Sequence, residues 1–313
     1  MIQKGDWKMY DLIIIGSGPA GLSAAVYAKR AGLDLVVLEK SPMSGGQILN
    51  TYEVDNYLGM PGINGFDMGM AFRAHADKLG IAFREAEVLQ ILDGGTYKTV
   101  RTAKEELQAR SIILATGAHH AQLGVTGEEE LSGMGVSYCA TCDGAFFRGK
   151  TVAVVGGGDV ALEDAIYLAR NCKKVYLIHR RDEFRGAKVL QEELLQKDNA
   201  EILYSHVVKE ICGADRVEKL MLEDVKSKET KELAVDGVFI AVGIHPDTEL
   251  VRGLAECDAS GYVLAGEDGV TSMPGLFVAG DARKKPIRQV VTAVADGANA
   301  AVSAGSYLGS QKV

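Results

Sequence analysis

The 313-residue sequence lacks features that mark several classes of protein. Its five cysteines are too few, and odd in number, for a disulfide scaffold, and they indicate a reducing compartment, which we expect to be the cytoplasm. The first residues do not follow the order of a signal peptide. The uncharged stretch at residues 12–28 contains Gly-Ser-Gly-Pro and falls short of a membrane span. Because acidic residues (42) outnumber basic residues (34), we expect no nucleic-acid or membrane partner.

Prolines are also few, six against 37 glycines, and the glycines follow short apolar runs. Residues 12–15 form an apolar run that leads into Gly16, Gly18 and Gly21, then into an alanine-rich segment and a second apolar run ending at Glu39. This is the order of a dinucleotide-binding β-α-β unit, in which the glycines allow a tight turn, close approach to a pyrophosphate, and close packing of the helix. A carboxylate such as Glu39 accepts hydrogen bonds from a ribose there.

The same pattern returns 140 residues later, as TVAVVGGGDVALEDAIYLARNCKKVYLIHRR. Gly156 to Gly158 replace Gly16 to Gly18, and Ala161 is small enough to replace Gly21. The position of Glu39 is taken by a basic cluster: His179, Arg180, Arg181 and Arg185. Guanidinium groups bind phosphate oxygens in bidentate fashion, so the cluster predicts a 2′-phosphate and hence NADPH. The alternative is a solvated basic helix start.

The order of these segments predicts the fold class. At about 150 residues per domain, the length suggests two domains. Apolar strands ending in glycine at residues 111–117 and 237–243 flank the second unit, as the crossing points of an inserted domain would. We therefore expect an α/β protein with two Rossmann-like domains, residues 119–245 being inserted between residues 1–118 and 246–313. A last strand ends at Asp281, which could face a ligand or merely cap a helix.

The pair Cys139 and Cys142 in SYCATCDG could bind a metal, brace the fold or carry electrons. A structural zinc site needs four ligands, whereas Cys172, Cys212 and Cys257 are isolated, so we expect no metal. A disulfide that closes a two-residue loop removes little chain entropy from the unfolded state. The redox interpretation is therefore favoured.

In their order along the chain, the motifs GSGPAG, GGQ, ATG, CATCDG, GGGDVALE, HRRDEFR, AGD and RQV resemble the low-molecular-weight thioredoxin reductases, which are flavoproteins. The resemblance covers nearly the whole chain. It departs at residues 1–9, a short extension, and at Thr126, where proline is usual.

The resemblance implies that the outer domain binds FAD and the inserted domain binds NADPH. The residues implied for FAD are Gly16, Ser17, Gly18, Pro19, Ala20, Gly21, Glu39, Lys40, Gly46, Gln47, Asn56, Val88, Thr116, Gly117, Gly280, Asp281, Arg288, Gln289 and Val290. Those implied for NADPH are Gly157, Gly158, Asp159, Ala161, Glu163, His179, Arg180, Arg181 and Arg185.

By the same resemblance, electrons pass from NADPH through FAD and the Cys139–Cys142 disulfide to thioredoxin. Cys142 would face the flavin, Cys139 would attack the partner, and the adjacent Asp143 would be the general acid unless it only caps its loop. The family further implies a homodimer. Since the disulfide and the NADPH site share the inserted domain, we expect that domain to rotate about residues 117–124 and 243–247.

Other functions remain open at this level. The partner could be another thioredoxin-like protein or a peroxidase, although a peroxidase-linked relative usually carries an extra N-terminal module. A ferredoxin-fed reductase would be expected to lack the GGG and HRR motifs. A redox sensor that binds both cofactors without turnover is a further alternative.

Overall fold

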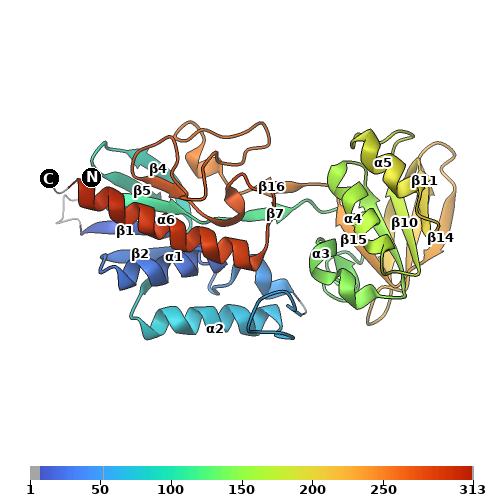
Figure 1. Cartoon of the computed structure of the whole chain (residues 1–313), viewed down its shortest axis with the longest axis horizontal. Coiled ribbons are helices and arrows are strands. Elements are labelled where there is room, and N and C mark those ends of the chain that lie inside the picture. The colour runs from blue at the N-terminus through green and yellow to red at the C-terminus, as the bar shows by residue number, and fades with distance from the viewer. Residues whose placement is uncertain (1–7, 52, 312–313) are drawn as a thin grey trace. The chain divides into compact units, whose positions relative to one another are not determined.

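A computed structural model describes residues 8–51 and 53–311, and of Asn50 only the backbone. The chain divides into two compact units (Figure 1). The outer unit contains the described residues up to 51, residues 57–119 and the residues from 245 onward. The inserted unit contains residues 120–244 together with the short segment 53–56.

The outer unit is built on a seven-stranded sheet with strand order β3-β2-β1-β6-β5-β4, in which β17 also pairs with β6. Strand β6 is long enough for two partners on one edge, since its first half pairs with β5 and its second half with β17. Strand β5 pairs antiparallel with both β4 and β6, and the other pairs of this sheet are parallel. The bounds are β1 Met9–Ile15, β2 Leu35–Glu39, β3 Ala82–Glu85, β4 Val88–Asp93, β5 Lys98–Thr102, β6 Glu106–Leu114 and β17 Leu276–Val278.

Helices α1 (Pro19–Arg30) and α6 (Val290–Ser310) pack against each other beside this sheet, with α2 (Gly65–Lys78) next to α1 (Figure 1). Their contact is lined by alanines and glycines, which let the two backbones approach closely. A Cβ atom on Gly297 would lie 2.1 Å from the carbonyl oxygen of Ala20. A second apolar cluster includes Ile13, Leu38 and Val263. Three short 3-10 turns, η1 (Gly46–Asn50), η3 (Glu249–Val251) and η4 (Gly280–Ala282), complete the unit.

The inserted unit repeats this plan with a five-stranded parallel sheet of order β11-β10-β9-β15-β8. Its strands are β8 Val136–Ser137, β9 Thr151–Gly156, β10 Lys174–His179, β11 Ala200–Tyr204 and β15 Gly237–Ala241. Helices α4 (Asp159–Ala169) and α5 (Lys188–Leu195) share an apolar core with it, and the short α3 (Ala140–Asp143) and η2 (Gly144–Phe147) precede β9. A separate antiparallel sheet consists of β12 His206–Cys212, β13 Lys219–Asp224 and β14 Thr230–Ala234.

The predicted α/β class with two Rossmann-like units is confirmed. The first strand begins at Met9, three residues before the predicted start, because Met9 and Tyr10 already pair with Gln108 and Ala109. The two connecting segments pair as β7 (Ala118–His120) and β16 (Ile244–Pro246). Among the helices of the described chain, none is long and apolar enough to cross a bilayer.

Candidate functional site

The first glycine loop joins β1 to α1 in a shape that side chains would disrupt. Gly16 has a φ of +102°, and a Cβ atom there would lie 2.4 Å from the carbonyl oxygen of Ala115. On Gly21 a Cβ atom would lie 2.0 Å from the carbonyl oxygen of Gly16. At Gly18, the N-cap of α1, a Cβ atom would make only ordinary van der Waals contacts, with the nearest atoms 3.9 Å away. The positive end of the α1 dipole is thus accessible to an anion.

Glu39, at the end of β2, is bonded to this loop. Its Oε2 accepts hydrogen bonds from the backbone N–H (2.8 Å) and the hydroxyl (2.7 Å) of Ser17. Its Oε1 accepts one from the backbone N–H of Ser41, at 3.0 Å. A cavity of about 150 Å³ adjoins it, lined by Glu39, Ser41, Pro42, Arg73, Phe83, Arg84 and Glu85. Sequence reasoning did not identify Arg73 and Arg84, because no local motif marks them.

Asp281 and Arg288 each supply a buried polar atom that lacks a well-formed hydrogen bond within the described chain. Oδ1 of Asp281 and Nε of Arg288 are buried without a hydrogen bond, although Lys285 Nζ lies 3.3 Å from that Oδ1. Burial raises the pKa of Asp281, and the nearby Lys285 opposes this shift. The guanidinium of Arg288 lies over the ring of Tyr262, 4.1 Å from its centroid. Because buried polar atoms without a hydrogen bond are costly, the pair fits a polar ligand.

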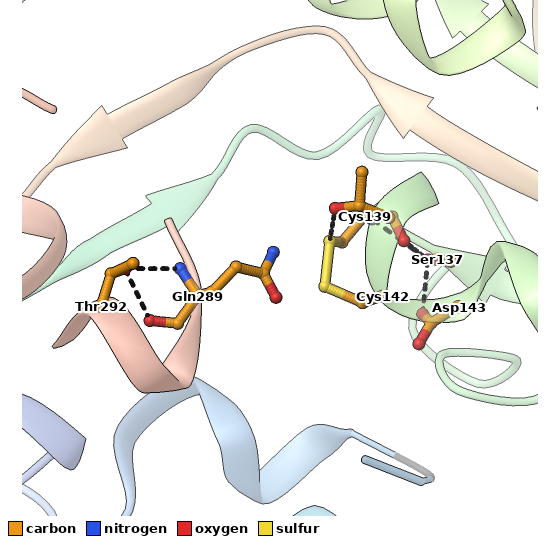
Figure 2. The surroundings of a disulfide bond; sticks show 7 residues. Ser137, Cys139, Cys142, Asp143, Gln289 and Thr292 are labelled. Carbon is orange, nitrogen blue, oxygen red and sulfur yellow. Dashed lines mark hydrogen bonds between the residues drawn. A yellow bond between two sulfur atoms is a disulfide. The ribbon is translucent and has the colours of Figure 1, made fainter. Parts of the chain in front are cut away.

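The alternative interpretation of Asp281 as a helix cap is not supported. Helix α6 is capped by Gln289 and Thr292, which form a reciprocal capping box. Figure 2 shows the two Thr292 contacts to Gln289. Gln289, predicted to contact FAD, therefore also holds the start of this helix.

A buried ionic network behind Asp281 was missed by sequence reasoning. Asp296 on α6 accepts bonds from Arg283 Nη2 (2.8 Å), Lys285 Nζ (3.1 Å) and the backbone N–H of Gly280 (3.1 Å). All three charged side chains are buried. In the sequence, ARKK looks like a surface run, and only the fold brings it to Asp296. The network fixes the loop that carries Asp281.

The remaining predicted FAD residues are spread over the outer unit, with one exception. Gln47 donates to the carbonyl oxygen of Ala118, and Thr116 donates to that of Asp247 at 2.5 Å. Asn56 falls in the segment that groups with the inserted unit. The others are Pro19 and Ala20 in the first turn of α1, exposed Lys40, Gly46 at the start of η1, buried Val88 in β4, Gly117 with positive φ, Gly280 at the start of η4 and Val290 at the start of α6.

In the inserted unit, the side chains of Cys139 and Cys142 are joined by a disulfide at the start of α3 (Figure 2). Both residues are partly exposed. Cys139 is the N-cap of α3, and its sulfur lies 3.4 Å from the Thr141 hydroxyl. Cys172, Cys212 and Cys257 carry no disulfide. Within the described chain, no group of three or more His, Cys, Asp or Glu residues could hold a metal.

Asp143, the last residue of α3, lies next to the disulfide in a largely buried position. Its Oδ2 accepts a hydrogen bond from the Ser137 hydroxyl at 2.6 Å (Figure 2). Burial raises the pKa of Asp143, because the charged carboxylate loses solvation, and the Ser137 bond acts in the opposite direction. A carboxyl with a raised pKa beside a disulfide is suited to hold and deliver a proton.

The second glycine loop is attached to the segment that carries the arginines. The carbonyl oxygen of Gly157 accepts bonds from the N–H groups of Arg185 (2.9 Å) and Gly186 (3.2 Å). Asp159 Oδ1 accepts one from the N–H of Ala187 at 2.7 Å. Gly158, the N-cap of α4, has open space where a Cβ atom would stand. Ala161 is buried in α4, and Glu163 is exposed on it.

The residues of the basic cluster lie in two different environments. Arg180, Arg181 and Arg185 are exposed, and within the described chain none of their guanidinium groups forms an ion pair. His179 is buried, with Nε2 3.0 Å from the carbonyl oxygen of Glu183 and the ring stacked on Phe184. Three unpaired guanidinium groups close to a glycine loop offer a binding surface for a phosphate.

The comparisons with known proteins agree with one another. The family model described as pyridine nucleotide-disulphide oxidoreductase matches residues 10–297. The chain is 43% identical over 302 residues to a thioredoxin reductase of Listeria innocua, covering 96% of this chain and 94% of that protein. It is 42% identical to one of Bacillus subtilis, with 96% and 95% covered. The crystal structure of a thioredoxin reductase from Streptococcus pyogenes matches with a TM-score of 0.93 at 43% identity, covering 96% of this chain and 99% of that one.

Proposed function

The chain belongs to the pyridine nucleotide-disulphide oxidoreductase family and, within it, to the low-molecular-weight thioredoxin reductases; from this we propose that it is an enzyme that reduces the disulfide of thioredoxin with electrons from NADPH. The observation that carries the proposal is that one folded unit contains both the Cys139–Cys142 disulfide and the second glycine loop with its unpaired arginines. In this proposal, an electron acceptor and the binding surface for the electron donor belong to the same unit.

FAD fits the outer unit. The N-terminus of α1 above Gly18 would hold the pyrophosphate, and Glu39 would accept hydrogen bonds from the adenosine ribose. Oδ1 of Asp281 and Nε of Arg288, which lack a well-formed hydrogen bond, would gain one from the bound cofactor. When bound, FAD would supply two-electron transfer between a nicotinamide and a disulfide.

NADPH fits the inserted unit. Gly157, Gly158 and the start of α4 would bind its pyrophosphate, with Asp159, Ala161 and Glu163 lying in the first two turns of the helix. Arg180, Arg181 and Arg185 would bind the 2′-phosphate. Buried His179, whose ring lies against Gly157, would fix the second glycine loop.

The cysteines and Asp143 perform the disulfide exchange. As a thiolate, Cys139 attacks one sulfur of the thioredoxin disulfide, and the other sulfur leaves with a proton supplied by Asp143. Cys142 then gives up its proton to the Asp143 carboxylate and attacks Cys139 in the mixed disulfide. The second thioredoxin sulfur leaves and takes up that proton, which releases dithiol thioredoxin and restores the Cys139–Cys142 bond. In balance, one NADPH and one proton reduce one disulfide to two thiols and yield NADP⁺.

The assembly and location of the enzyme are further parts of the proposal. We propose a homodimer, in line with the family resemblance, and light scattering of the purified protein tests it. We propose the cytoplasm as its location because the five cysteines, three of them without a disulfide here, suit a reducing compartment.

Steady-state oxidation of NADPH by the purified, flavin-loaded protein tests the function. Thioredoxins, glutaredoxins and a peroxidase serve as separate acceptors, and a disulfide dye serves as the general one. Turnover with a thioredoxin supports the proposal. Turnover with only the peroxidase or a glutaredoxin would show that this acceptor, and not thioredoxin, is the partner. Flavin reduction without turnover on any acceptor would indicate a redox sensor.

A further inference from the structure

We propose that Ser137 is a positioning residue, whose hydroxyl holds the carboxyl of Asp143 next to the disulfide in both protonation states and sets the pH range over which Asp143 delivers its proton. The inference rests on the proposed function, since it concerns the acid that acts in disulfide exchange.

Ser137 is held rigidly by the sheet. It is the last residue of β8, it pairs with Phe239 of β15, and it is only 5% exposed. The pairing fixes its backbone relative to β15, and burial limits the space that its side chain can occupy. A polar group this deeply buried needs partners, and all the partners of this hydroxyl belong to the redox segment.

Three contacts surround the Ser137 hydroxyl oxygen (Figure 2). It lies 2.6 Å from Asp143 Oδ2, 3.1 Å from the backbone nitrogen of Cys139 and 3.4 Å from the carbonyl oxygen of Cys139. A hydroxyl donates one hydrogen bond and accepts two, so it can bond the Cys139 amide and Asp143 at the same time.

The contacts suit both forms of Asp143. When Asp143 is ionised, the Ser137 O–H donates to Oδ2 and the oxygen accepts the Cys139 N–H. When Asp143 is protonated, its own O–H can donate to Ser137, whose hydrogen then turns to the Cys139 carbonyl oxygen. In each form Asp143 Oδ2 and the Cys139 amide remain bonded, so the acid stays beside the disulfide while its proton comes and goes.

Among the described elements packed against Asp143, no charged group takes the place of Ser137. Helix α3 packs against η2, whose residues Gly144–Phe147 carry no titratable group, and against α4. The shift in the pKa of Asp143 comes from burial and from Ser137, without a contribution from the acids of α4. The strands β8 and β15 carry no titratable side chain. The titratable residues of α4 are Asp159, Glu163, Asp164 and Tyr167.

The direction in which loss of Ser137 moves the pKa of Asp143 follows from the form of the carboxyl group that its hydroxyl binds more strongly. A hydroxyl donates a stronger bond to a carboxylate than to a carboxylic acid, so it favours ionisation, and its removal raises the pKa of Asp143 further. Delivery of a proton requires the acid form, so the rate falls at high pH. Without Ser137 this fall moves to higher pH.

The experiment is a titration of the oxidised protein labelled with [¹³Cγ]aspartate, followed by NMR. The Asp143 signal is assigned by its loss in Asp143→Asn. In Ser137→Ala we expect its midpoint to rise by about one to two pH units, the equivalent of losing one charge-assisted hydrogen bond. Ser132→Ala, which removes an exposed hydroxyl of the same unit, should leave it unchanged. Ser137→Gly provides a second variant without the hydroxyl and should show the same rise.

A second measurement is the pH profile for reduction of a disulfide dye by the prereduced enzyme. The falling limb should move to higher pH in Ser137→Ala, and the same substitution should have no effect on the limb in Asp143→Asn. An unchanged midpoint in Ser137→Ala would overturn the inference. Because the NMR titration needs no thioredoxin, a failure of the proposed function would appear separately, as wild-type protein that oxidises no NADPH with any acceptor.

Discussion

The ring of His179 lies directly on Gly157, so that a Cβ atom on this glycine would stand 2.1 Å from Cε1 of the imidazole. The contact joins the end of β10 to the second glycine loop, the two segments that form the proposed NADPH site. A buried ring thus fixes the loop, whereas the exposed arginines that follow it remain available to a ligand.

The first prediction separates two neighbouring glycines. Gly157→Ala should lower the free energy of unfolding by about 1 to 3 kcal/mol, because its methyl group overlaps the His179 ring. Gly158→Ala should fold with a change of about 0.5 kcal/mol or less, since its methyl group enters open space. If that space receives the pyrophosphate, Gly158→Ala should still weaken NADPH binding at least about tenfold. Chemical denaturation and NADPH titration provide the two readouts. Wild-type NADPH affinity in Gly158→Ala would place the cofactor elsewhere.

A second prediction concerns the choice between NADPH and NADH. Changing Arg180 and Arg181 together to alanine should weaken NADPH binding by several kcal/mol, at about 1.5 to 3 kcal/mol for each charge-assisted hydrogen bond. Turnover with NADH should hardly change, because NADH lacks the 2′-phosphate. Arg170→Ala, at the exposed end of α4, is the matched control. Equal weakening of both nucleotides would show that the arginines do not read the phosphate.

The sequence predicted those features that depend on local pattern. The two β-α-β units, the turns at Gly16 and Gly156 and the position of Glu39 follow from the spacing of apolar and glycine residues, because each unit must turn sharply between a strand and a helix. The role of each cofactor residue stays a prediction.

Features that depend on long-range contacts could not be predicted. Lys98 is 1% exposed and is tolerated in the core because Asp93 lies 2.9 Å away and the carbonyl oxygen of Gly95 accepts a bond from it. The burial of Arg283 and Lys285 is offset by Asp296, 11 to 13 residues further along the chain. A prediction from the sequence places such charged side chains on the surface, because only the packing of α6 brings them together. The contact from Ser137 to Asp143 spans only six residues and was missed for a different reason, because β8 is only two residues long and leaves no strand pattern in the sequence.

A third prediction is a dependence of stability on pH that comes from Asp164. Burial in α4, with a further contribution from Glu163, raises the pKa of Asp164 to about 7. For an acid with a raised pKa, the stabilising contribution is complete below the unfolded pKa of about 4 and is lost as the pH rises through 7. Asp164→Asn should therefore be more stable than wild type at pH 8, on the order of 2 to 4 kcal/mol, with a smaller gain at pH 5. Denaturant unfolding at both pH values measures the difference. Asp198→Asn, at an exposed acid of the same unit, should follow wild type, and an equal gain at both pH values in Asp164→Asn would contradict the prediction.

The last prediction separates the entry of electrons from their exit. Cys139→Ser and Cys142→Ser should each abolish thioredoxin reduction, because the exchange requires a disulfide that can re-form between the two sulfurs. Reduction of the flavin by NADPH should continue near the wild-type rate, since hydride transfer uses neither sulfur. Asp143→Asn should slow thiol release by roughly 10²-fold or more, in the range of general acid catalysis, and should also leave flavin reduction unchanged.

Stopped-flow absorbance of the flavin and a coupled thioredoxin assay measure the two steps. Cys257→Ser, which removes an exposed thiol outside the site, is the control and should behave as wild type in both. Wild-type thioredoxin turnover in Cys142→Ser would exclude this disulfide from the electron path, and a loss of flavin reduction in both serine variants would show that the cysteines act before the flavin rather than after it.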